Sequence, residues 1–343
     1  MSKQYELFVS CYGNSDEETI HWLKFDETEE AIHHVSSFSG VENPSFVTVN
    51  DKADRLYAIS EVDQGEVISF AIDHHQNHLT EMNRQQTKGG PCHLIIGGKT
   101  PHLFTANYGG GSVIVHRLRD TGEIENETDF KAYNGVDSSV ISHVHMIKNV
   151  PNTNYFVATD LGKDKLYFYQ LLEEEGKLID VCSQDLPQGS GPRHIAFHPQ
   201  HNKMYVINEH RSTIFVYTYD LHEKIIKLEQ KIATLPEDFH GKSHGAEIQL
   251  SSCGKYLSAS NRGHDSITSF QVLQDGRLEK ISDISVMGNW PRHFLVLPNS
   301  NYVIVANEHS HELVVMKRQS DGSLEVTNGR YKLNRPVCVQ VLK

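Results

Sequence analysis

A short two-strand unit recurs six times along the 343-residue chain, and this repeat constrains the fold more than any other feature. The clearest copy runs Gly191-Pro-Arg-His-Ile-Ala-Phe-His-Pro199, passes a polar turn, and continues as Met204-Tyr-Val-Ile-Asn-Glu209. In every copy, 15 positions separate the third residue of the opening triplet from the residue that closes the second strand. The six pairs are Phe46 and Glu61, His93 and Tyr108, His145 and Asp160, His194 and Glu209, Ala246 and Asn261, and His293 and Glu308.

Successive copies lie 47 to 52 residues apart, which leaves room for four short strands in each. A period near fifty with several strands per repeat is typical of a β-propeller blade. The termini supply a seventh blade, because residues 335–342 resemble one more opening strand and residues 6–10, 19–25 and 32–37 resemble the three strands that would follow it. We therefore predict an all-β chain, a seven-bladed β-propeller of four-stranded antiparallel blades. It would form a single domain over residues 1–343, with one blade closed by the N- and C-terminal strands. A β-sandwich is the alternative, but sandwiches do not repeat at a constant register.

Composition excludes several classes of protein. No window approaches eighteen consecutive apolar residues, and the N-terminus lacks a cationic head followed by an apolar stretch, so we expect neither a membrane span nor a secretory signal. The formal net charge of −12 argues against a nucleic-acid binder. The cysteines are odd in number and form no CxxC pair, which predicts neither a disulfide framework nor a thiolate zinc site. They are Cys11, Cys92, Cys182, Cys253 and Cys338. We expect a cytoplasmic protein, a monomer or weak homo-oligomer.

The repeat predicts where polar side chains gather. In a propeller blade the start of the first strand and the end of the second lie at the same mouth of the central channel, so the opening and closing residues should surround one pocket. Basic groups at one mouth of an acidic protein indicate an anionic small-molecule ligand, and arginine suits carboxylate or phosphate because its planar fork bonds two oxygens. The predicted pocket residues are His93, Tyr108, His143, His145, Arg193, His194, Glu209, Arg262, Arg292, His293 and Glu308, with Asp160 and Glu247 among the interleaved acids.

Part of this pattern also has a purely architectural interpretation. His93, His194 and His293 share one repeat position, so they could serve blade structure alone. Arg193 and Arg262 differ from their counterparts in most other copies, which favours a functional role. His143 and His145 alternate along one expected strand and should therefore point to opposite faces. That alternation argues against a two-histidine metal pair in this segment.

Several motifs together resemble the lactonase family of seven-bladed propellers, and the resemblance covers nearly the whole chain. They are Ala-Asn-Tyr-Gly-Gly-Gly-Ser-Val at 106–113, His-Val-His at 143–145, the 191–199 segment, Val-Ile-Asn-Glu at 206–209 and Ala-Ser-Asn-Arg-Gly at 259–263. This family includes bacterial propeller-type 6-phosphogluconolactonases and the fungal carboxy-cis,cis-muconate cyclase. The resemblance implies hydrolysis of 6-phospho-D-glucono-1,5-lactone, an anionic lactone substrate, with His145, Arg193, Glu209 and Arg262 as the catalytic group. It requires no cofactor and no metal.

Two questions stay open at this point. Either Glu209 or His145 could take the proton from the attacking water, while Arg193 and Arg262 hold a phosphate or the developing oxyanion. Other functions also fit a propeller, because the fold hosts many. The alternatives are a carboxylated-lactone cyclase, a calcium-dependent sugar lactonase, and a non-catalytic binding scaffold. A scaffold would not need charged residues at dissimilar repeat positions around one mouth.

Overall fold

The computed structural model describes residues 3–135 and 139–342, and they form 28 β-strands arranged in seven four-stranded sheets. Within these described residues there is no helix, and hence none long and apolar enough to cross a bilayer. The chain divides into two compact units, and each is considered by itself below.

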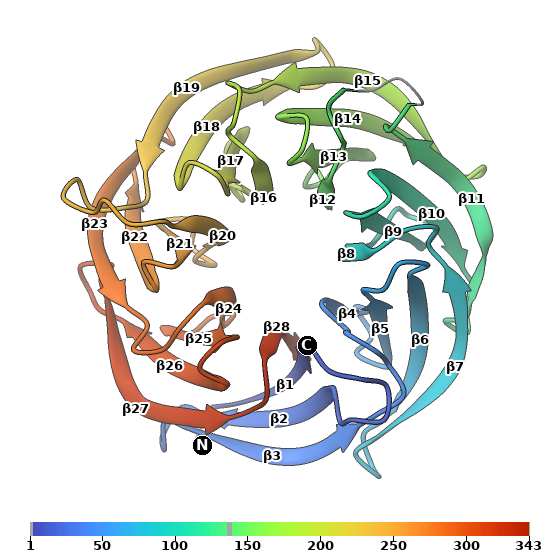
Figure 1. The fold of residues 1–343 in the computed structure, drawn as a ribbon, viewed down its shortest axis with the longest axis horizontal. Helices are drawn as coiled ribbons and strands as arrows, with labels where there is room; N and C mark the ends of the chain where they lie inside the picture. The colour runs from blue at the N-terminus through green and yellow to red at the C-terminus, as the bar shows by residue number, and fades with distance from the viewer. Residues whose placement is uncertain (1–2, 136–138, 343) are drawn as a thin grey trace. The chain divides into compact units, whose positions relative to one another are not determined.

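The first, which we call the C-terminal unit, consists mainly of residues 186–339 together with the segment 26–32. It contains three complete sheets whose strands follow in sequence order and pair antiparallel, one sheet after the next (Figure 1). Their strands are β16 (Pro192–Phe197), β17 (Lys203–Asn208), β18 (Thr213–Asp220) and β19 (Ile225–Ala233); β20 (His244–Leu250), β21 (Tyr256–Arg262), β22 (Ser266–Val272) and β23 (Leu278–Ser285); and β24 (Pro291–Val296), β25 (Tyr302–Asn307), β26 (Glu312–Arg318) and β27 (Leu324–Lys332).

The second, the N-terminal unit, consists mainly of residues 33–185 together with residues 5–25. It also contains three complete antiparallel sheets. Their strands are β4 (Val47–Val49), β5 (Arg55–Ser60), β6 (Glu66–Asp73) and β7 (His78–Gln86); β8 (Pro91–Gly97), β9 (His102–Asn107), β10 (Ser112–Leu118) and β11 (Ile124–Ala132); and β12 (Val144–Asn149), β13 (Tyr155–Asp160), β14 (Lys165–Leu172) and β15 (Lys177–Asp185).

The seventh sheet draws its strands from both ends of the sequence, as predicted. Its order is β28-β1-β2-β3, so the last strand of the chain lies beside the first (Figure 1). The strands are β28 (Pro336–Leu342), β1 (Gln4–Cys11), β2 (Ile20–Asp26) and β3 (Ala31–Phe38). Pairing the two terminal strands removes a free sheet edge, where unpaired backbone groups would otherwise be exposed.

Neighbouring sheets of one unit pack face to face through apolar side chains. In the C-terminal unit, Tyr205 and Ile207 of β17 pack with Leu257 and Phe270 of the following sheet. In the N-terminal unit, Phe104 of β9 stacks on a phenylalanine of β13, with ring centroids 4.2 Å apart. Polar contacts reinforce this packing, because the buried Tyr205 hydroxyl donates to the carbonyl of Gly276 at 2.9 Å. Each of these two pairs of sheets therefore encloses a layer of buried apolar side chains.

A β-bulge interrupts the first strand of most blades at the same place. Pro192 pairs with Asn208, but the next pair joins His194 to Ile207, so Arg193 is an extra residue in β16. We call this the bulge position. A bulge bends the strand and re-aims the side chain it carries. Equivalent extra residues occur at Cys92 in β8, His145 in β12 and Arg292 in β24.

The bulges correct our alignment in two of the six copies. Val144 pairs with Asp160 as Pro192 pairs with Asn208, so the true counterparts of His194 and Glu209 are one residue later than His145 and Asp160. They are Met146 and Leu161. The predicted spacing of 15 residues survives, but its placement in this copy was wrong by one.

The same one-residue correction applies to the copy of β20 and β21. Gly245 pairs with Asn261 and Ile248 with Ala259, which makes Glu247 and Arg262 the counterparts of His194 and Glu209. Neither of the two misplaced copies opens with the proline that begins the other four opening triplets, so the sequence offered no anchor for the bulge. We call the place of His194, Glu247 and His293 the post-bulge position, and the place of Glu209, Arg262 and Glu308 the strand-end position.

Candidate active site

Arg193 lies at the bulge of β16 and is 2% exposed. Its Nε atom lies 3.2 Å from Oε2 of Glu209. Its Nη1 atom donates to the carbonyl of Ala246 at 2.8 Å, and to Nε2 of His194 at 3.4 Å. Backbone and side-chain acceptors therefore fix the guanidinium on both sides, in a direction that the bulge makes available.

Glu209 comes directly after β17 and receives a second arginine on the same carboxylate oxygen. Nη2 of Arg262 lies 2.7 Å from Oε2. Burial by itself would raise the pKa of Glu209, but the charges of Arg262 and Arg193 outweigh it and hold the pKa below its ordinary value. The Glu209 side chain keeps 19% of its surface exposed. It is thus an ionised, partly accessible carboxylate held between two cations.

The two guanidiniums stay charged although they are buried. Burial, together with the charges of Arg262 and Arg292, lowers the pKa of Arg193 to about 9, although Glu209 and Glu247 act to raise it. Burial also lowers the pKa of Arg262, while Glu209 raises it. At neutral pH the cluster holds two positive charges and one negative charge, with Arg292 close enough to act on all three groups. This surplus of positive charge suits an anion.

A second buried network lies next to Arg193 and includes His194, which accepts a hydrogen bond from it. Oε2 of Glu247, which is 4% exposed, lies 2.9 Å from Nδ1 of His194 and 3.4 Å from Nε2 of His293. Because Arg193 donates to Nε2 of His194, the proton of a neutral His194 must sit on Nδ1, where it is donated to Glu247. The carboxylate therefore fixes the imidazole tautomer that accepts from Arg193.

Sequence reasoning noted Glu247 among the acids of the pocket but did not place it in the site. The signal that could have found it is the repeat itself, because Glu247 occupies the post-bulge position where β16 and β24 carry histidine. His293 is buried and its pKa is lowered to about 4 by that burial. The backbone N–H of Val339 donates to Nδ1 of His293, so a neutral His293 presents its Nε2 proton to Glu247.

Glu308 and Arg292 complete the predicted residues of the C-terminal unit. Glu308 is buried and accepts from Nη2 of Arg335 at 3.0 Å. It also raises the pKa of Arg262. The predicted residues of this unit thus form one continuous electrostatic group, drawn from three sheets. They are Arg193, His194, Glu209, Arg262, Arg292, His293 and Glu308.

The remaining predicted residues form a separate aromatic cluster in the N-terminal unit. His143 stacks on Tyr108, with centroids 4.4 Å apart and planes at 19°, and His145 meets the same ring edge-on at 5.8 Å. Nδ1 of His143 also lies 3.0 Å from the Tyr108 carbonyl oxygen. The expectation that the two histidines point to opposite faces was wrong, because His143 precedes β12 and His145 sits at its bulge, where alternation breaks. His93 packs on Phe46 at 4.4 Å.

Asp160, which we placed among the pocket acids, serves the fold instead. It is fully buried, and its carboxylate accepts from the Ser142 hydroxyl at 2.5 Å and from the His143 backbone N–H at 3.0 Å. Asn261, at the same place in β21, donates to the carbonyl of Thr234 at 3.0 Å. These residues fasten the strand end to its neighbours.

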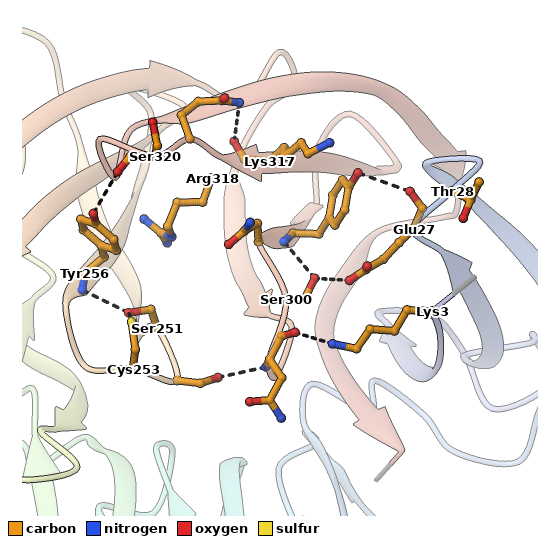
Figure 2. A pocket seen from close by; sticks show the side chains of 15 residues that line it. Lys3, Glu27, Thr28, Ser251, Cys253, Tyr256, Ser300, Lys317, Arg318 and Ser320 are labelled. Carbon is orange, nitrogen blue, oxygen red and sulfur yellow. Dashed lines mark hydrogen bonds between the residues drawn. The ribbon is translucent and has the colours of Figure 1, made fainter. Parts of the chain in front are cut away.

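A pocket lies elsewhere in the C-terminal unit (Figure 2). Its volume is about 1150 Å³, and among the described residues that line it are Tyr256, Lys317 and Arg318 but none of the predicted site residues. Arg318 donates to the carbonyl of Gly322 and to the hydroxyl of Ser258, and its guanidinium lies over Tyr256. These contacts tie β26 to β21, which accounts for the arginine structurally.

Across residues 3–135 and 139–342, no group of three or more histidine, cysteine, aspartate or glutamate side chains is arranged to hold a metal ion. The prediction that the reaction needs no metal stays a prediction.

Comparison with known proteins identifies the family. Residues 6–341 match the family described as lactonase, 7-bladed beta-propeller. A 6-phosphogluconolactonase of Bacillus subtilis is 32% identical over 99% of both chains. The periplasmic gluconolactonase PpgL of Pseudomonas aeruginosa superposes with a TM-score of 0.91 at 25% identity over 99% of both chains. A protein from Lactobacillus plantarum superposes with a TM-score of 0.92 at 25% identity, over 99% of this chain and all of that one. The chain is a seven-bladed β-propeller and belongs to the lactonase family.

Proposed function

We propose that the chain hydrolyses 6-phospho-D-glucono-1,5-lactone to 6-phosphogluconate, as in the oxidative pentose phosphate pathway. Family membership supports lactone hydrolysis in general, and the name of the Bacillus subtilis relative supports the phosphorylated sugar lactone in particular. The observation that carries the proposal is the pair of buried guanidiniums on one oxygen of Glu209. Their surplus positive charge fits an anionic substrate and an anionic transition state.

In the proposed step, Glu209 takes a proton from water while the water oxygen attacks the lactone carbonyl carbon. The carbonyl oxygen becomes an oxyanion, which Arg193 and Arg262 stabilise. When the tetrahedral intermediate collapses, the bond between the carbonyl carbon and the ring oxygen breaks. The ring oxygen then takes the proton from Glu209 and becomes a hydroxyl, and the new carboxylic acid loses its own proton to solvent.

The structure supports Glu209 as an acceptor that is ionised across the physiological pH range, since its pKa is held low. The same low pKa makes it a weak base, so its contribution depends on the closeness and alignment of the water rather than on basicity. His145, edge-on to Tyr108 in the N-terminal unit, is the alternative base. Separate Glu209→Gln and His145→Gln variants distinguish the two candidate bases. Replacing the true base removes the acidic limb of the profile of rate against pH, whereas replacing the other residue leaves that limb in place.

We further propose a single cytoplasmic domain over residues 1–343, a monomer or weak homo-oligomer that binds neither nucleic acid nor membrane. The exposed thiol of Cys253 supports a reducing compartment, and a phosphorylated sugar would be met inside the cell. The Pseudomonas relative is described as periplasmic, so the fold alone does not determine the compartment.

The test is a side-by-side assay of 6-phosphogluconolactone and unphosphorylated gluconolactone, each with and without chelator. A no-enzyme control is essential, because these lactones also hydrolyse spontaneously. We expect the phosphorylated lactone to be preferred and the rate to be insensitive to chelator. Equal rates on both lactones would refute phosphate recognition, and chelator-sensitive activity would refute the metal-free step.

A further inference from the structure

The residue immediately before the proline that opens a blade adopts a left-handed backbone in several blades. Its φ angle is 45° at Asn43, 64° at Gly191, 63° at Trp290 and 43° at Arg335. Glycine takes this conformation without steric cost and asparagine tolerates it, whereas a bulky side chain is an outlier there. The turn therefore needs a left-handed residue but does not need a tryptophan. The tryptophan at position 290 is therefore explained by its side-chain contacts rather than by the turn.

Trp290 lies directly against the proposed active site. The guanidinium of Arg262 is 5.4 Å from the centroid of its ring, and His309 stacks on the ring at 4.7 Å with the planes at 13°. The position of the Arg262 guanidinium over the ring is that of a cation–π contact, which is most favourable for tryptophan. Arg262 is also the arginine that makes the 2.7 Å contact with Glu209.

The backbone of Trp290 is tied to the turn that follows Arg262. Its N–H donates to Oδ1 of Asp265 at 2.8 Å, and the side chain of Asn289 donates to Oδ2 of Asp265 at 2.6 Å. The same Oδ1 accepts from the N–H of Gly263. One carboxylate thus joins the loop that carries Trp290 to the turn after β21, so the ring and the guanidinium are fixed in one frame.

We propose that Trp290 is a positioning residue that holds the Arg262 guanidinium in place for lactone hydrolysis. This inference rests on the function proposed above. Arg262 reaches the cluster through a long flexible side chain, and among the described residues its hydrogen bonds go to Glu209 and, at 3.3 Å, to the carbonyl of Gly245. The indole face is a further contact that restricts the rotation of this side chain. The left-handed backbone is tolerated because it delivers the ring to this place.

The kinetic test compares three variants at this position. Trp290→Phe keeps an aromatic face, Trp290→Leu keeps an apolar side chain without one, and Trp290→Gly relieves the backbone conformation. We expect the Leu and Gly variants to lower kcat about tenfold with little change in KM, and the Phe variant to stay within about threefold of the parent. Asn43→Gly is the matched control at the same left-handed position and should leave kcat unchanged.

Dependence on Arg262 separates positioning from a general structural effect. If Trp290 acts through Arg262, then adding Trp290→Leu to Arg262→Ala produces no further loss. A Leu variant as active as the parent would overturn the proposal, and so would losses that multiply in the double variant. A Phe variant as impaired as Leu would also contradict it, since the aromatic face would then be irrelevant.

Fluorescence tests the contact without relying on activity. The chain has two tryptophans, Trp22 and Trp290, so Trp22→Phe leaves Trp290 as the sole emitter. Adding Arg262→Ala should change its emission intensity or maximum, because the neighbouring cation is removed. If the parent protein hydrolyses no lactone, the proposed function is wrong. The fluorescence comparison still shows, independently of activity, whether Trp290 contacts Arg262. Identical spectra in the two backgrounds would overturn the positioning role.

Discussion

The two units build the same blades but fill equivalent positions differently. At the strand-end position, the C-terminal unit carries Glu209, Arg262 and Glu308, whereas the N-terminal counterparts are Glu61, Tyr108 and Leu161. Because the backbone pairing is the same in both, blade architecture does not require the charged residues. The repeat therefore supplies equivalent positions in both units, and in the C-terminal unit all three of them carry a charged residue, against one of three in the N-terminal unit.

The bulge position shows the same contrast. It holds Arg193, Ala246 and Arg292 in the C-terminal unit, and Cys92 and His145 in the N-terminal unit. The arginines enter an ion network, whereas the buried Cys92 thiol donates to the His145 carbonyl at 3.2 Å. A bulge therefore re-aims whatever side chain it carries, and the chemistry depends on the residue placed there.

The largest effect is expected at Arg193 and Glu209. Arg193→Ala removes a donor to the proposed oxyanion, and Glu209→Gln removes the proposed base, so each should lower lactonase activity by about 10²–10³. Initial rates, with circular dichroism to confirm folding, measure the effect. Cys92→Ala, at the same bulge position in the other unit, should keep its activity. Near-parental turnover in the Arg193 and Glu209 variants would remove both residues from the mechanism.

Acid stability should involve both units alike. Burial lowers the pKa of His293 to about 4, and the same cause lowers that of His116 in the N-terminal unit to about 4. Below its ordinary pKa each histidine is protonated only in the unfolded chain, so stability is lost as pH falls from about 6.5 to about 4. Each should contribute about 3 kcal/mol to this loss.

Chemical denaturation across that pH range measures the loss. His293→Gln and His116→Gln should each flatten the dependence of the unfolding free energy on pH. A profile that superimposes on the parent for either variant would contradict the buried neutral state of that histidine. The comparison separates a property of the blades, shared by both units, from the charge network of one.

A smaller kinetic effect is expected at Glu247. In Glu247→Gln, the amide can donate to Nδ1 of His194, which moves the imidazole proton to Nε2 and opposes the N–H of Arg193. We expect kcat to fall roughly tenfold, the scale of one lost hydrogen bond to a charged group. Met146→Leu is the control at the equivalent post-bulge position. An unchanged kcat and pH profile in Glu247→Gln would show that the network does not act on Arg193.

The smallest effect concerns contacts that both units share. Tyr205 and Tyr57 each lie three residues before the last residue of their strands, β17 and β5. The Tyr205 hydroxyl donates to the carbonyl of Gly276 and the Tyr57 hydroxyl to that of Gly122, both at 2.9 Å. Tyr205→Phe and Tyr57→Phe should each cost about 1 kcal/mol of unfolding free energy and leave the lactonase rate unchanged. Urea denaturation measures the cost. A loss of activity in either variant would mean that the sheet contacts are not independent of the site.

Much of the fold was predictable because strand periodicity and repeat spacing are local properties of the sequence. The joining of residues 335–342 with the N-terminal strands followed from counting blades, and the structure confirms it. The bulges were not predictable, because the extra residue of a bulge changes the backbone pairing but can be of many residue types. His145 and Ala246 were consequently aligned one residue early, and Asp160 was taken for a pocket residue when it fastens a strand end.

The candidate site was predictable where a motif carried it and not where only geometry did. Arg193, Glu209 and Arg262 lie in recognisable segments, and the structure places them in contact. Glu247 belongs to the site because it contacts two histidines of other strands. Trp290 belongs to it because a left-handed turn brings its ring against Arg262. Such relations between side chains of different sheets leave no local pattern in the sequence.

A crystal structure with bound 6-phosphogluconate tests the central claim most directly. We expect oxygens of the bound anion within hydrogen-bond distance of the guanidiniums of Arg193 or Arg262, beside Glu209. An anion bound instead in the spacious pocket around Arg318, with the Arg193–Glu209–Arg262 cluster empty, would contradict the account.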